Sequence, residues 1–162
     1  MAATSLNVAI VGAGYWGKNL LRTFRGLSTA RVSALCDLDA PTLQAFKAEH
    51  PDLDTTTDFA GLLARPDVDA VVLATPPSRH HAMALAALEA GKHVWVEKPL
   101  ALTAAHGREL VATAKRHGTT LFVDETFLYD PLVVEIRQRI EAGELGDIYH
   151  LSFERLGMGR IR

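Results

Sequence analysis

Three glycines near the start of the chain have the spacing of a turn that binds phosphate. Gly12, Gly14 and Gly17 form G-x-G-x-x-G where the apolar run 6–14 gives way to a helical pattern over 15–27. In this motif the first glycine permits a tight turn, the second lets a pyrophosphate approach, and the third lets the helix pack close to the strand. Free N–H groups at the helix start can then bind phosphate oxygens. The spacing predicts a dinucleotide site, with a plain strand–helix turn as the alternative.

An acidic residue ends the next apolar run, 31–37. Asp37 lies twenty positions beyond Gly17. A carboxylate there suits the two hydroxyls of an adenosine ribose and repels a 2′-phosphate, and no arginine follows directly to reverse that preference. We therefore expect NAD rather than NADP. Asp37 could instead cap the helix that follows, although Asp39 suits that role better. S-adenosylmethionine enzymes also combine a glycine-rich loop with an acid at this place.

The stretch HVWVEKPL, 93–100, places an acid and a base at the end of a strand-forming run. Pro99 restricts Lys98 to extended geometry. A lysine at the carboxyl end of a buried strand can be partly desolvated, which favours the neutral amine that proton transfer needs. Glu97 and Lys98 are thus candidates for acid–base chemistry. Composition alone favours a solvated surface lysine.

The loop ATPPSRHH, 74–81, follows another apolar run and holds further candidates. Thr75 and Pro76 begin a rigid turn at the edge of the sheet where ligands of open α/β sheets bind. His80, in the first turn of the next helix, either reaches a ribose or phosphate or is solvated. For His81 we expect a solvated side chain. No two histidines have metal-ligand spacing and Cys36 is the single cysteine, so we expect no metal site.

The elements that must position these residues alternate between short β-branched runs and longer helical patterns. This order predicts an α/β fold, a doubly wound and mostly parallel Rossmann sheet. The expected strands span 6–14, 31–37, 69–75, 93–97, 120–125 and 147–156, and the expected helices span 15–27, 41–50, 58–65, 78–91, 104–118 and 130–146.

Composition excludes several classes of function. The 162 residues are 48% hydrophobic and 22% charged, which is ordinary for one globular domain. The net charge is −2 without a basic tract, so charge does not favour nucleic-acid binding. The N-terminus lacks the pattern of a signal peptide, and no apolar stretch is long enough to span a membrane. We expect a cytoplasmic protein.

Several motifs together resemble the Gfo/Idh/MocA family of oxidoreductases. They are VAIVGAGYWGKNLLRTF, CDLD, ATPPSRH, VWVEKPLALT and FLYDPLVVEIRQRIEAGELGDIYHLSFERLG, which cover nearly the whole chain. The resemblance is greatest to the branch that acts on nucleotide-linked sugars and polyols. It implies a Rossmann domain over 1–127, with a linking helix and the start of a second, truncated α+β domain over 128–162, whose first strand would be 147–156.

The resemblance also implies roles for matching residues. Lys98 would be catalytic, assisting proton transfer at the substrate oxygen, while nicotinamide performs the hydride chemistry on a sugar or polyol. The implied cofactor-binding residues are Gly12, Gly14, Tyr15, Trp16, Gly17, Asp37, Leu38, Thr75, Pro76, His80, Glu97 and Lys98. The chain departs from the branch at Asp124 and Glu125, where a glycine and a histidine are common, and the two acids change the local charge.

Two other functions stay open. The chain could be a dinucleotide-binding module without dehydrogenase activity, which dimerises or docks to a partner chain through the strand 147–156. It could also be an acid–base catalyst on the same frame without hydride transfer, because fold does not dictate function.

Overall fold

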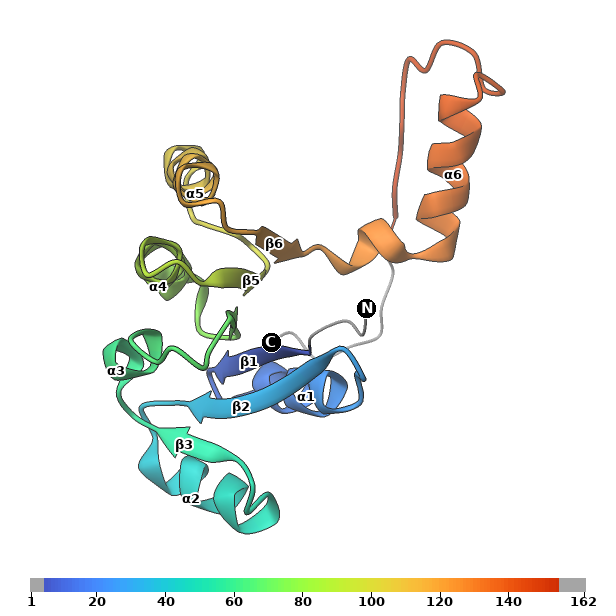
Figure 1. The fold of residues 1–162 in the computed structure, drawn as a ribbon. Coiled ribbons are helices and arrows are strands. Elements are labelled where there is room, and N and C mark those ends of the chain that lie inside the picture. Colours follow the sequence, from blue (N-terminus) through green and yellow to red (C-terminus); the bar gives the residue numbers. More distant parts are fainter. Residues whose placement is uncertain (1–4, 155–162) are drawn as a thin grey trace. The chain divides into compact units, whose positions relative to one another are not determined.

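The apolar runs of the sequence form the strands of one parallel sheet. The computed structural model describes residues 5–154. Its strands are β1 (Leu6–Val11), β2 (Ala30–Cys36), β3 (Asp54–Thr56), β4 (Ala70–Leu73), β5 (His93–Glu97) and β6 (Leu121–Asp124). They lie in the order β3-β2-β1-β4-β5-β6, and every neighbouring pair is parallel (Figure 1). The predicted α/β Rossmann architecture is confirmed.

The helices between these strands begin where the sequence supplies a cap. They are α1 (Tyr15–Arg25), α2 (Ala40–Glu49), α3 (Phe59–Leu63), α4 (Pro77–Glu89) and α5 (Ala104–His117). The side chains of Asp39, Asp58 and Thr103 each accept a hydrogen bond from a backbone N–H of the first turn. Each cap satisfies a donor that the helix itself leaves unpaired, so the helix starts are fixed locally.

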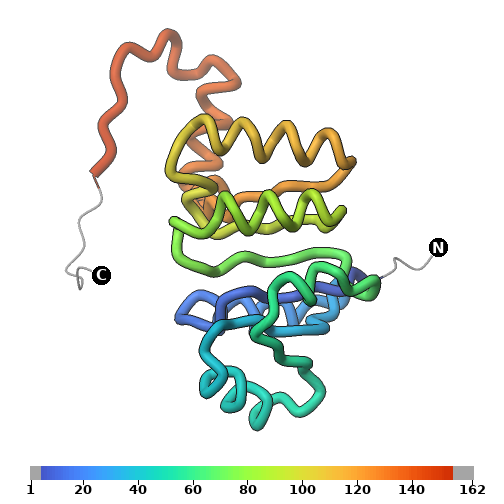
Figure 2. Tube along the Cα trace, turned by 90° about the vertical axis from the view of Figure 1, so that its left-hand side faces the viewer, coloured from blue at the N-terminus to red at the C-terminus, as the bar shows by residue number. Residues whose placement is uncertain are grey.

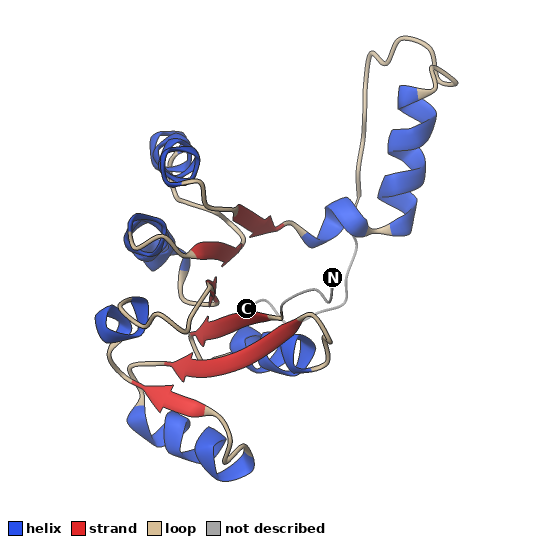
Figure 3. Ribbon diagram, viewed as in Figure 1, coloured by secondary structure: helices blue, strands red, loops and turns tan. Residues whose placement is uncertain are grey.

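The apolar core lies in two layers, one on each face of the sheet. Helices cover both faces of the sheet (Figure 3). On one face α3, α4 and α5 cover inward-facing residues of β1, β4 and β5, such as Val71 and Val96. Helices α4 and α5 run side by side there (Figure 2). On the other face α1 and α2 cover residues such as Ile10 and Leu35. Burial on both faces explains why these strands read as continuous apolar runs.

One strand was absent from the sequence-based prediction. Strand β3 consists of Asp54, Thr55 and Thr56, which pair with the end of β2. It is short and polar, so no apolar run marks it, and only pairing with β2 makes it a strand.

Residues beyond the sheet form a second compact unit, which begins at Glu125. It contains a 3₁₀ turn (Thr126–Tyr129) and α6 (Pro131–Glu141). The side chain of Asp130 accepts a hydrogen bond from Leu132 N (2.9 Å) and starts α6. The assignment of 1–127 and 128–162 to two domains stays a prediction.

The predicted strand 147–156 is wrong for residues 147–154, which form no helix or strand. A strand needs a hydrogen-bonded neighbour, and no strand of the described chain pairs with this segment. Residues 155 and 156 lie outside the described part. The proposed docking through this strand therefore has no support from residues 147–154.

Candidate functional site

The predicted site residues gather at the carboxyl edge of the sheet. Because all strands are parallel, the segments that follow β1, β2, β4 and β5 meet at that one edge. Open α/β sheets bind ligands there. The fold thus brings together the glycine loop, Asp37, the loop after β4, and the Glu97–Lys98 pair.

Two glycines of the glycine loop are required by close packing of the protein's own backbone. Gly12 has a φ of +97°, and a Cβ atom there would lie 2.6 Å from the carbonyl oxygen of Ala74. A Cβ atom on Gly17 would overlap the carbonyl oxygen of Gly12. These two positions therefore exclude any side chain, because the backbone of the loop packs against them.

Gly14 differs, because its Cβ atom would meet nothing within 4 Å and its φ of −70° suits any residue. Packing within the described structure gives no reason for a glycine here. The open space lies at the N-cap of α1, where no side chain caps the start of the helix. Such a space fits the pyrophosphate of a dinucleotide.

Asp37 is tied to the glycine loop. Its Oδ2 accepts a hydrogen bond from Ala13 N (2.6 Å), and its Oδ1 accepts one from Asp39 N (2.9 Å). Asp39, and not Asp37, caps α2, so the alternative role of Asp37 as that cap is wrong. The Asp37 carboxylate thus lies beside the loop predicted to bind pyrophosphate, as a ribose ligand should.

Cys36, the residue before Asp37, carries a thiol that its surroundings make unreactive. Cys36 is buried. Burial, followed by the negative charges of Asp37 and Asp58, raises the pKa of the Cys36 thiol to about 11. The thiol therefore stays protonated at neutral pH and offers no nucleophile at this edge.

Three exposed apolar side chains border the same loop. Tyr15 and Trp16 are 62% and 49% exposed, and their rings meet edge to face with centroids 5.5 Å apart. Leu38, directly after Asp37, is 88% exposed. Exposed apolar side chains beside a ligand edge provide surface against which a flat ring can pack.

His80 is completely buried, so the solvated alternative is wrong for this residue. Its Nε2 lies 2.7 Å from the carbonyl oxygen of Thr75, and its Nδ1 lies 2.7 Å from that of Pro99. A neutral imidazole donates only one N–H, whereas the imidazolium donates to both carbonyls. His80 thus ties the loop after β4 to the turn that carries Lys98.

Thr75 adds a further mark of a ligand site. Its hydroxyl is buried and finds no hydrogen-bond partner among the described residues. Buried polar atoms are normally paired, so an unpaired hydroxyl at a ligand edge fits a group supplied by a bound molecule. Pro76, the N-cap residue of α4, follows it in the same loop.

His81 is also less solvated than predicted. Its Nε2 lies 2.8 Å from Oε2 of Glu109, and its ring stacks on that of His106 with centroids 3.9 Å apart. These contacts join α4 to α5.

Glu97 and Lys98 differ sharply in burial. Glu97, the last residue of β5, is only 8% exposed, and it lies in register with Asp124, the last residue of β6. Burial, then the charge of Asp124 and a hydrogen bond with it, raise the pKa of the Glu97 carboxyl, while the charges of Lys98 and His80 act in the opposite direction. Lys98 itself is exposed, so the predicted partial desolvation is not seen.

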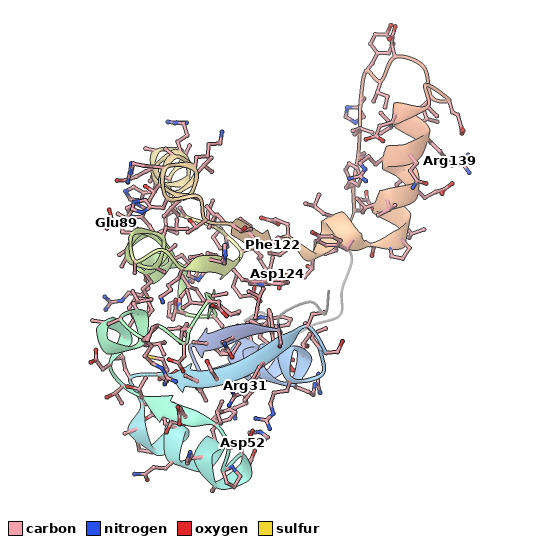
Figure 4. The ribbon with its side chains drawn as sticks, viewed as in Figure 1. Arg31, Asp52, Glu89, Phe122, Asp124 and Arg139 are labelled. Carbon is pink, nitrogen blue, oxygen red and sulfur yellow. The ribbon has the colours of Figure 1, made fainter. Side chains whose placement is uncertain are left out.

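The pairing of Glu97 with Asp124 was missed at the level of sequence. Both acids end strand-forming runs, and aligning those ends would have placed them side by side had β5 and β6 been known as neighbours. Figure 4 labels Asp124 and Phe122, which lie two positions apart on β6 and therefore on the same face of the sheet. No group of three or more metal-ligating side chains occurs within residues 5–154. Over the same range, no helix is long and apolar enough to cross a membrane.

Comparisons with known proteins agree with this geometry. Residues 6–125 match the sequence model of a family described as "Oxidoreductase family, NAD-binding Rossmann fold". The chain is 38% identical over 147 residues to inositol 2-dehydrogenase 1 of Saccharopolyspora erythraea, an alignment that covers 88% of this chain and 43% of that protein. It is 33% identical over 153 residues to 2,7-anhydro-N-acetylneuraminate hydratase of Mediterraneibacter gnavus, covering 94% and 40% of the two.

Among solved structures, the WlbA dehydrogenase of Bordetella pertussis, in complex with NADH and UDP-GlcNAcA, superimposes with a TM-score of 0.85 at 29% identity. The match covers 92% of this chain and 43% of that one. The chain therefore spans less than half the length of the relatives it resembles.

Proposed function

Because the chain belongs to the Gfo/Idh/MocA family of oxidoreductases, an NAD-binding Rossmann family, we propose that it is the dinucleotide-binding part of an NAD-dependent dehydrogenase. The substrate we propose is a sugar, nucleotide sugar or polyol with a hydroxyl or keto carbon. The names of the inositol dehydrogenase and of the UDP-GlcNAcA-bound dehydrogenase support this class. We place the residues that would select one substrate in a second domain, outside the Rossmann sheet.

In this function one half of the sheet edge binds the dinucleotide, and the other half takes part in proton transfer. Gly14 and the first N–H groups of α1 bind the pyrophosphate, and Asp37 binds the adenosine ribose. When bound, the nicotinamide supplies or accepts the hydride. Lys98, exposed at the same edge, donates a proton to the substrate oxygen or accepts one from it. His80 holds the turn that carries Lys98.

The observation that carries the proposal is the space at Gly14. Packing explains Gly12 and Gly17, whereas the Cβ atom added at Gly14 would meet no atom of the protein, so the space there is open to a ligand. A phosphate that approaches the backbone would meet that Cβ atom.

Titration with NADH tests this assignment. We expect the parent chain to bind NADH, detected by energy transfer from Trp16 and Trp95, and Gly14→Ala to weaken binding by about tenfold or more, or about 1.4 kcal/mol. Gly107→Ala is the matched control. Its Cβ atom would make only an ordinary 3.9 Å contact with Leu100, and alanine suits the helix interior. Equal NADH affinity in both variants would contradict the phosphate site.

Lys98→Ala tests the proton-transfer role. Because Lys98 is exposed, its removal should leave stability unchanged within about 0.5 kcal/mol. We expect NADH affinity to change little, and turnover of inositol or nucleotide-sugar substrates by the dehydrogenase of which this chain is a part, followed by NADH absorbance, to be lost. Turnover at the parent rate would remove Lys98 from the mechanism.

A second function is favoured by one comparison. A relative that is 33% identical carries the name of a hydratase, so acid–base chemistry without net reduction of a cofactor occurs among proteins similar to this chain. Loss or gain of water from a sugar substrate, measured by mass spectrometry without net NADH formation, would favour this function over the dehydrogenase.

A further inference from the structure

Two carboxyl groups lie side by side at the end of the sheet. Glu97 and Asp124 are register partners on the parallel strands β5 and β6. Residues paired in this way project from the same face of the sheet. Trp95 and Phe122, two positions earlier on each strand, are also register partners, and their rings meet with centroids 4.2 Å apart.

Burial makes two negative charges at this place unfavourable. Glu97 is 8% exposed and Asp124 is half-buried. Two adjacent carboxyls in a site with little water keep one proton between them, because the second ionisation meets both desolvation and repulsion. The raised pKa of Glu97, caused first by burial and then by Asp124, agrees with this arrangement.

The charged groups that act on the pair come from two further places. Lys98 follows Glu97 in the chain, and His80 reaches the same turn from α4 through the carbonyl oxygen of Pro99. Both favour ionised Glu97, but neither reverses the direction of its pKa shift. Burial and the neighbouring carboxyl therefore outweigh these two positive charges at Glu97, and a further positive charge nearby would favour its ionised form.

The topology indicates where such a charge would come from. The pyrophosphate site lies after β1 and the adenosine ribose site lies after β2, on one side of it. A dinucleotide extended along the edge must place its other half on the opposite side, toward β4 and β5. The oxidised nicotinamide ring carries a positive charge, whereas the reduced ring is neutral.

We propose that Glu97 and Asp124 hold a single proton between them, and that this proton passes to solvent when the oxidised nicotinamide ring binds beside the pair. Only an O–H bond breaks in this step, and no electrons are transferred. The pair then acts as a positioning group whose charge matches the oxidation state of the cofactor. The inference rests on the proposed function, since it requires a bound dinucleotide.

The coupling between proton release and NAD⁺ binding determines the direction of the pH effect. Where the pair holds its proton, NAD⁺ must displace it, so its binding tightens as pH rises through the titration of the pair. NADH has no ring charge, and its affinity stays nearly constant. The ratio of the NAD⁺ and NADH dissociation constants should therefore fall with rising pH, by about tenfold in total and by no more than about tenfold per pH unit.

The test measures both dissociation constants by calorimetry on the 162-residue chain from mildly acidic to mildly alkaline pH. We expect the ratio to fall with pH in the parent and to be constant in Asp124→Asn and in Glu97→Gln. Glu89→Gln is the control, because Glu89 is an exposed carboxyl at the end of α4, on the opposite edge of the sheet (Figure 4). It should behave as the parent does.

The outcomes separate the two proposals. Binding of both dinucleotides with a constant ratio in the parent overturns the shared-proton inference and leaves the proposed function intact. No binding of either overturns the proposed function and this inference with it. A second measurement covers a variant that folds poorly: buffer-dependent calorimetry of the parent alone should show up to about half a proton released per NAD⁺, as a total effect of about tenfold requires, and none per NADH. Equal proton release with both would also overturn the inference.

Discussion

The two ends of the ligand edge are built by different means. After β1 and β2, backbone atoms form the site: Gly12 and Gly17 fit against carbonyl oxygens, and the carboxylate of Asp37 binds the loop N–H of Ala13. After β5 and β6, side-chain charge forms the site, with buried Glu97 beside Asp124 and exposed Lys98 next to them. One end depends on close packing of the main chain, and the other depends on the balance of nearby charges.

This difference predicts different responses to substitution. Adding a methyl group should damage the first end, whereas removing a charge without changing shape should have little effect on folding there. At the second end, a substitution that removes a charge should change stability, because a neutral isostere relieves the repulsion between the two carboxyls. Removing the exposed lysine should cost little, because it contributes little to packing.

The largest effect should come from Gly17→Ala. The new Cβ atom would overlap the carbonyl oxygen of Gly12, so helix α1 must move from the sheet. We expect the free energy of unfolding in urea to fall by about 3 kcal/mol. Gly107→Ala, which adds the same methyl group inside α5, should be neutral or stabilising by about 1 kcal/mol. Equal stability of the two variants would show that the glycine loop is not held by close packing.

An intermediate effect should come from Asp37→Ala. The change removes the predicted ribose ligand and the acceptor for Ala13 N (2.6 Å). We expect NADH affinity to fall by about 2 kcal/mol and the preference for NADH over NADPH to diminish. Asp39→Ala is the control, because it removes the cap of α2 at a cost of about 1 kcal/mol in stability. Should it weaken NADH as strongly, Asp37 has no special role.

The smallest effect should come from Asp124→Asn, and it should depend on pH. The pKa of Glu97 is raised in the folded chain above its ordinary value of 4.5, so the folded state binds this proton more tightly than the unfolded state does. The stability linked to Glu97 is therefore present below that value and is lost as pH rises through the raised pKa. Asp124→Asn should reduce this loss.

Urea unfolding of Asp124→Asn should thus show a gain of about 1 kcal/mol in mildly alkaline buffer and little change in acid, the size expected for repulsion between adjacent unit charges. Glu89→Gln should show no such gain. A gain that is the same at every pH would indicate a packing effect instead of a charge effect.

The sequence by itself determined the order of the helices and of the strands β1, β2, β4, β5 and β6, the glycine loop and the cap at Asp39. These features are local, because apolar periodicity, glycine spacing and short polar side chains act within a few residues of the backbone they organise. The resemblance to one oxidoreductase family likewise came from contiguous motifs.

The tertiary structure alone decided the rest. Pairing with β2 made a strand of the polar residues Asp54–Thr56, and residues 147–154, without a pairing neighbour in the described chain, formed none. His80 is buried, and its two ring nitrogens contact the carbonyl oxygens of Thr75 and Pro99, which lie far apart in the sequence. Glu97 met Asp124 because β5 and β6 are neighbours in register. Hydrogen-bond partners, burial and charge repulsion all act between distant segments, so they exist only once the chain has folded.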